Sequence, residues 1–150
     1  MKNALTFSPL DGSLHISDYA VEIGPNLTKA QAYVAFASFH PTKVDHGNGY
    51  AWLTLHGMNL GGHPCTISLG FFGERLERVH WGVELSDAIL EEGWPTRETS
   101  EKEIQFVRTH LGAVFQRSFR KGEETFPWGV AWSTFDSKGF SASSGLRYVD

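Results

Sequence analysis

The sequence contains one cysteine, Cys65, among its 150 residues. No internal disulfide can form, which excludes the disulfide-stapled class of small secreted domains and favours a reducing compartment; we expect the cytoplasm. The N-terminal stretch MKNALTFSPLDG has no apolar segment of signal-peptide length. No stretch approaches the roughly 18 apolar residues of a membrane-spanning helix. These absences predict a protein that works inside the cell and does not cross a membrane.

Positive charge is also scarce. The 13 Lys and Arg residues are outnumbered by 17 Asp and Glu, which gives a formal net charge of −4. Binding to nucleic acid calls for a basic face, so this balance argues against a nucleic-acid partner. The composition is 41% hydrophobic and 20% charged, as in ordinary globular proteins. We therefore expect a single domain over residues 1–150, and the sequence does not predict its oligomeric state.

Catalytic motifs are missing as well. No histidine lies in a HExxH spacing, no G-x-S-x-G elbow occurs, and the glycine-rich stretch 57–62 joins two predicted strands, unlike a phosphate-binding loop, which opens a helix. We expect no enzymatic activity, no catalytic residues, no cofactor and no bound metal. One alternative is a metal site, because His56, His63 and Cys65 flank one turn and His80 is a further possible ligand. Against it, a thiol in an apolar strand is typical of inert packing.

The middle of the chain alternates apolar and polar residues with a period of two. This pattern predicts three strands, over residues 50–60, 64–72 and 75–85, that form a meander with one apolar face and one polar face. Residues 4–23 read as short strands broken by a turn at 9–12, because Pro, Asp and Gly gather there. The polar stretch 41–49 reads as a loop.

Two helices are predicted. In the first, Thr28 caps a helix over residues 29–38, with Tyr33, Val34 and Ala37 on one side.

For the second helix, Ser100 and Glu103 have the spacing of a capping box, and apolar residues follow at helical intervals. This helix is expected to run to about Arg120 and to stop at Gly122.

The chain closes with FPWGVAWSTFDSKGFSASSGLRYV, residues 126–149, which reads as a hairpin with its turn at 136–139. Phe126, Trp128, Val130 and Trp132 are expected on one face of its first strand, with mostly small residues on the return strand. Such pairs fill space against a helix. The whole order predicts an α+β fold, an antiparallel sheet of about six to eight strands with two main helices packed on one face.

Negative charge is concentrated in one segment. Between residues 84 and 103 there are seven acidic residues and two basic ones. Within it, residues 91–95 read EEGWP and place a tryptophan in an exposed loop. An acidic surface with an aromatic anchor suits a basic protein partner, because charge steers the encounter and the aromatic ring supplies a hot spot. The predicted partner-binding residues are Glu84, Asp87, Glu91, Glu92 and Trp94.

Two other interpretations of the sequence stay open. In the first, the acidic segment is a solvated loop and a helix start matched to the helix dipole, with Trp94 stapled to the core. In the second, the protein binds a small ligand or acts as a sensor, with a pocket between the sheet and the second helix lined by Trp81, Trp128 and Trp132.

Three stretches carry a family resemblance: VEIGPNLTKAQ (21–31), LGFFGERLERVHWGVEL (69–85) and the closing FPWGVAWSTFDSKGFSASSGLRY (126–148). Together they resemble small bacterial proteins that are similar to immunity proteins encoded beside contact-dependent or type VI secreted toxins. The shared residues are aromatics, glycines and turn residues. The resemblance implies a cytoplasmic α+β protein that binds one cognate toxin and blocks it. It assigns no functional residue.

Overall fold

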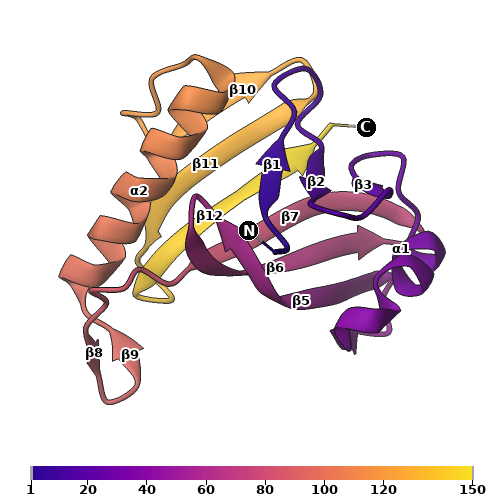
Figure 1. The fold of residues 1–150 in the computed structure, drawn as a ribbon, viewed down its shortest axis with the longest axis horizontal. Helices are drawn as coiled ribbons and strands as arrows, with labels where there is room; N and C mark the ends of the chain where they lie inside the picture. The colour runs from indigo at the N-terminus through magenta and orange to yellow at the C-terminus, as the bar shows by residue number, and fades with distance from the viewer. Residues whose placement is uncertain (1, 150) are drawn as a thin grey trace.

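A computed structural model describes residues 2–149. The elements, in chain order, are β1 (Leu5–Phe7), β2 (Leu14–Ile16), β3 (Glu22–Ile23), α1 (Lys29–Ala35), a short 3-10 helix η1 (Ala37–Phe39), β4 (Thr42–Asp45), β5 (Tyr50–Leu60), β6 (His63–Phe72), β7 (Arg75–Val83), β8 (Leu90–Glu91), β9 (Trp94–Pro95), α2 (Arg97–Phe115), β10 (Glu123–Phe126), β11 (Gly129–Asp136) and β12 (Ser141–Tyr148). Seven strands form one antiparallel sheet in the order β10-β11-β12-β7-β6-β5-β4 (Figure 1). The predicted α+β class is confirmed. No helix within residues 2–149 is long and apolar enough to cross a membrane.

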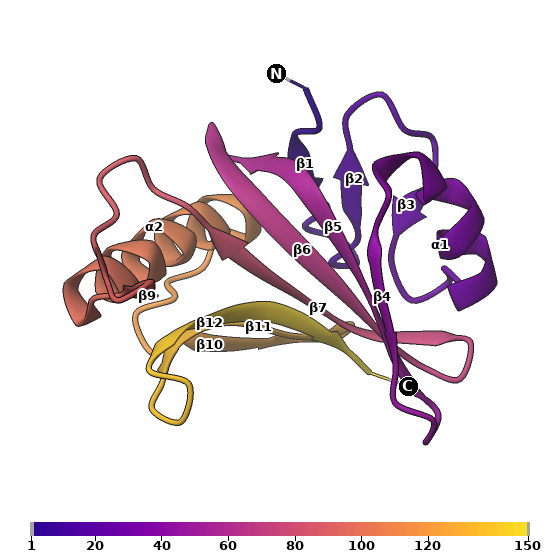
Figure 2. The ribbon, with the colours of Figure 1, turned by 90° about the horizontal axis from the view of Figure 1, so that it is seen from below.

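The large sheet has one covered side. In Figure 2, α2 and the small three-stranded sheet β1-β2-β3 lie above the arch of β10–β12, and the space below that arch is open. The core fills the covered side, where the Phe7 ring lies 5.2 Å from Trp81. The N- and C-terminal parts are joined there by a buried hydrogen bond of 2.7 Å, which the Tyr148 hydroxyl donates to the carbonyl of Gly12.

The central meander is confirmed. β5, β6 and β7 pair in sequence, and the alternating side chains that face the covered side are buried, as at Leu53, Ile67 and Val79. The loop expected at 41–49 is only partly right, because β4 pairs with β5 there. All four residues of β4 are exposed, so this edge strand has no apolar alternation to reveal it.

The first helix begins as predicted but buries a different side. Thr28 and Gln31 form a complete capping box. The buried side chains are Ala32 and Phe36, whereas Val34 is 81% exposed. The helix ends at Ala35, so it is too short to hold the stripe that the sequence suggested.

The second helix begins four residues earlier than predicted. Thr96 is its N-cap and accepts a hydrogen bond from the amide of Thr99 (3.2 Å). Ser100 instead lies inside the helix and is buried. The Glu103 carboxylate reaches away from the helix and accepts a hydrogen bond from the amide of Val83 (3.0 Å), so it ties α2 to β7.

The same helix also ends earlier, at Phe115. Gln116 takes a left-handed conformation with φ 53°, and the chain turns there. This turn returns Phe119 to the core, where its ring lies 6.4 Å from Phe115 and 6.5 Å from Phe126. Burial of this ring explains why the helix does not continue to Arg120.

The closing segment holds three strands. Phe126 pairs with Gly129 across a two-residue turn, so β10 and β11 form a hairpin of their own. The rings of Phe126 and Trp128 stack in the core, 5.0 Å apart. Trp132 points to the opposite side of the sheet, where its ring lies 5.3 Å from His80. The prediction that these aromatics share a face is therefore wrong.

Small residues of the closing strands face α2. Ser133 and Ser144 are buried on the covered side, and their hydroxyls lie 2.8 Å apart. Trp81 is also buried there, whereas Trp132 lies across the sheet. The pocket that the sequence allowed between sheet and helix cannot be lined by both tryptophans, because the sheet separates them.

Candidate functional site: an exposed acidic hairpin

A two-stranded hairpin projects from the body beside the start of α2 (Figure 1). In it Leu90 pairs with Pro95, and Glu91 pairs with Trp94. Glu92 and Gly93 form the turn, and both have positive φ, 51° and 84°. Two successive positive φ angles give the primed turn that matches the twist of a tight hairpin. The local sequence thus folds residues 89–95 into a protruding finger, which we call the acidic hairpin.

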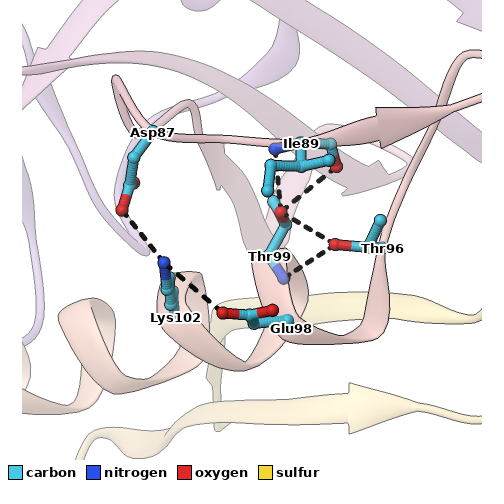
Figure 3. A network of polar contacts seen from close by, with 6 residues as sticks. All are labelled: Asp87, Ile89, Thr96, Glu98, Thr99 and Lys102. Carbon is cyan, nitrogen blue, oxygen red and sulfur yellow. Dashed lines mark hydrogen bonds and ion pairs between the residues drawn. The ribbon is translucent and has the colours of Figure 1, made fainter.

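The base of the acidic hairpin is held by one side chain of α2. The Thr99 hydroxyl accepts a hydrogen bond from the amide of Ile89 (2.9 Å) and donates one to the carbonyl of the same residue (3.1 Å) (Figure 3). The Thr96 hydroxyl donates to Thr99 Oγ1 (3.0 Å), and the Thr96 amide donates to the Ile89 carbonyl (3.1 Å). Thr99 therefore bonds to Ile89 as a neighbouring strand would, and it fixes the hairpin to the helix.

The acidic hairpin carries large apolar side chains in solvent from its base to its tip. Trp94 is 69% exposed, Leu90 60% and Ile89 53%. Because Glu91 pairs with Trp94 and successive strand residues alternate, Ile89 and Trp94 lie on one face of the hairpin and Leu90 lies on the other. Single exposed apolar residues are common on proteins, but a protruding element that carries them on both faces is of the kind found at interfaces. Exposure of Trp94 was predicted from the sequence, whereas exposure of Ile89 and Leu90 was not. The sequence feature that could have indicated their exposure is the apolar pair Ile89-Leu90 directly before Glu91 and Glu92.

The acidic residues around this tip differ in how far their charge is compensated. Asp87 forms an ion pair with Lys102 (3.1 Å), and this bond holds the pKa of Asp87 below its ordinary value. Lys102 also contacts Glu98 at 3.7 Å. Glu91 and Glu92 are exposed and make no ion pair within residues 2–149. Free negative charge therefore lies at the tip, and the charge at the base is partly neutralised.

The structure brings part of the predicted site together. Glu91, Glu92 and Trp94 share the acidic hairpin, and Asp87 lies at its base. Glu84 lies outside it, directly after β7, where its amide donates to the carbonyl of Pro64 (2.8 Å). The interpretation in which Trp94 is stapled to the core is wrong, because its ring is mostly in solvent.

The alternative metal site does not assemble. The His56 ring contacts the Thr42 hydroxyl (3.2 Å) at the sheet edge, whereas Cys65 is buried in the core. His63 stacks edge-on against Phe106 at 4.8 Å. Within the described part of the chain, no three His, Cys, Asp or Glu side chains gather closely enough to hold a metal ion.

His80 lies on the open side of the sheet, between Trp52 and Trp132, with ring separations of 5.1 and 5.3 Å. Burial, aided by the nearby charge of Arg78, lowers the pKa of His80 to about 4. The ring is therefore neutral at physiological pH and packs as an uncharged aromatic side chain between the two tryptophan rings.

Comparisons with family models and with curated proteins gave no match. Among solved structures, the chain is similar to a chain of a complex described as "Rhs1-CT in complex with cognate immunity protein RhsI1". The TM-score is 0.53 at 10% sequence identity, and the superposition covers 96% of this chain and 86% of that one. At this identity the likeness concerns the fold, and it agrees with the resemblance noted in the sequence.

Proposed function

We propose that the chain is a non-enzymatic immunity-type protein of bacterial origin that binds a cognate protein toxin and neutralises it by occlusion. The observation that carries this proposal is the acidic hairpin, an anchored finger with Ile89, Leu90 and Trp94 in solvent and the exposed carboxylates of Glu91 and Glu92 beside them. The fold likeness to a chain of a toxin–immunity complex and the sequence resemblance support the same class of protein.

The chemistry of the acidic hairpin suits a particular kind of partner surface. A pocket that accepts the Trp94 ring would remove a large aromatic surface from water, and such rings dominate interface energies. Glu91 and Glu92 stand beside it and match Lys or Arg side chains around that pocket. Complementary charge accelerates the encounter, and the buried ring slows dissociation. We therefore assign to the toxin a basic surface with an apolar recess at or near its active site.

Growth and binding assays test the proposal. The probe is the product of the gene beside this one, which the proposal expects to carry a toxin domain. Expression of the chain alone should leave bacterial growth unchanged, which a toxin would not do. Co-expression should restore growth that the neighbouring domain arrests. Calorimetry with the two purified proteins should then show a complex at nanomolar to low micromolar concentration.

Matched variants connect that complex to the acidic hairpin. Trp94→Ala should weaken binding by about 30-fold or more, the effect of a hot-spot residue. Phe140→Ala is its control, because Phe140 is 70% exposed at another hairpin turn. Glu91→Lys with Glu92→Lys should mainly slow association, and that loss should shrink at high salt. Growth arrest by the chain itself, or no complex with the neighbouring domain, would refute the proposed function. Equal losses in the Trp94 and Phe140 variants would refute the contact surface.

A further inference from the structure

A hollow of about 740 Å³ opens at the other end of the molecule from the acidic hairpin. Its lining residues come from β3, α1, the segment between them and the turn that precedes β2. Figure 1 shows these elements together, away from β8 and β9. Its apolar lining comes from Val21, Leu27, Ala30 and Val34. Val34 is 81% exposed. A polar residue would be equally compatible with the short helix α1 at this position, yet the residue there is apolar. The volume is large enough to enclose several side chains or a ligand of comparable size. We call this hollow the α1 groove.

The charge of the α1 groove has one sign. Asp11 and Glu22 line it, and its lining includes no lysine, arginine or histidine. Neither carboxylate makes an ion pair within residues 2–149. One oxygen of Asp11 accepts hydrogen bonds from the Ser13 amide (3.0 Å) and hydroxyl (2.7 Å), which lower the pKa of Asp11 and keep it charged. An occupant of this groove meets apolar side chains and fixed negative charge.

The backbone beside the α1 groove has a free strand edge. β3 pairs with β2 on one side, and within the described residues no strand pairs with its other side. Figures 1 and 2 both place α1 beyond that other side. A strand edge with unpaired amides and carbonyls accepts an extended peptide, and pockets beside it select alternate side chains. The groove therefore suits an extended chain better than a compact ligand.

We propose that the α1 groove binds an extended segment of a partner protein in which aliphatic residues alternate with lysine or arginine. The aliphatic side chains lie on Val21, Leu27 and Val34, and the cations pair with Asp11 and Glu22. The segment runs along the free edge of β3. This inference rests on the groove alone and does not depend on the acidic hairpin or on the proposed function.

Two synthetic peptides test the proposal with the intact protein. One alternates lysine and valine over seven residues, and the other alternates glutamate and valine. In ¹⁵N-labelled protein, the lysine peptide should shift the amide signals of residues 21–24, 26–27 and 30–35 in a saturable way at micromolar to millimolar concentration. The glutamate peptide should leave them unchanged, because it repels both carboxylates.

Matched variants locate the contacts. Glu22→Lys should weaken lysine-peptide binding at least about fivefold, since an attraction becomes a repulsion. Its control is Glu123→Lys, an exposed carboxylate on the distant strand β10. Val34→Asn should weaken binding at least about threefold through lost apolar contact. Its control is Val44→Asn, at an exposed valine on β4.

Several results would overturn the proposal. They are the absence of saturable shifts at millimolar peptide, equal response to both peptides, and shifts centred outside the groove. If the amide signals of groove residues move when the protein alone is diluted, a second copy of the protein occupies the groove. That result would also contradict the proposal that the groove binds a basic segment of a partner protein. Circular dichroism of each variant checks that the fold is retained.

Discussion

Thr99→Val removes the one hydroxyl that holds the acidic hairpin to α2 and keeps the shape of the side chain. The Ile89 amide then loses its acceptor, while the Ile89 carbonyl keeps the bond from the Thr96 amide. The Thr96 hydroxyl also loses one acceptor but still caps the helix through the Thr99 amide. The change therefore acts on the hairpin base and spares the helix cap.

The size of the effect follows from those bonds. Leaving one part-buried amide without an acceptor costs about 1–3 kcal/mol. The acidic hairpin has no core of its own, so it can open while the rest stays folded, and the cost appears as local opening. Since about 1.4 kcal/mol is tenfold in an equilibrium constant, exchange protection of the Ile89 amide should fall roughly 5- to 150-fold. The thermal midpoint of the whole protein should change little.

Hydrogen–deuterium exchange measured by NMR gives this quantity for each amide. Thr109→Val is the matched control, because Thr109 is an exposed threonine of the same helix. Exchange of the Ile89 amide should accelerate in the Thr99 variant alone. If both variants protect Ile89 as the wild type does, Thr99 does not fix the hairpin, and the explanation of its rigidity is wrong.

Three further predictions concern the body of the protein. Burial raises the pKa of the Cys65 thiol to about 12, so native protein at pH 8 should resist thiol reagents that label the unfolded chain at once; rapid native labelling contradicts this. Burial lowers the pKa of His80 from 6.5 to about 4, so the unfolded chain binds the proton more tightly than the folded protein does. The free energy of unfolding should therefore fall as the pH drops from 6.5 to 4. The ring should titrate near 4 by NMR, and titration near 6.5 would contradict its burial. Tyr148→Phe removes the hydroxyl that donates to the buried Gly12 carbonyl and should lower the free energy of unfolding in denaturant by about 1–3 kcal/mol. Tyr50→Phe, at an exposed ring, should lower it little. Equal losses would show that the bond to Gly12 contributes nothing to stability.

Much of the sheet could be predicted because alternation is a local signal. β5, β6 and β7 bury alternate side chains over most of their length, with one interruption in each, so their period appears in the sequence. β4 gives no such signal, because all its side chains are exposed at the sheet edge. The face of Trp132 was predicted wrongly because the turn at 127–128 begins a new strand. A single continuous strand would have kept Phe126 and Trp132 on the same side.

The errors at α2 have a different cause. Thr96, Thr99 and Ser100 are all acceptable caps, and local propensity does not rank them. The choice depends on partners distant in the chain, since Thr99 bonds to Ile89 and Glu103 bonds to Val83. The acidic segment could be found by its charge and its tryptophan. Its folding into an anchored hairpin depended on those same contacts.

The most decisive measurement is calorimetry of the wild type and of Trp94→Ala with the product of the gene beside this one, which the proposal expects to carry a toxin domain. We expect a tight wild-type complex that the substitution weakens by about 30-fold or more. A complex whose affinity is unchanged by loss of the Trp94 ring, or no complex at all, would contradict it.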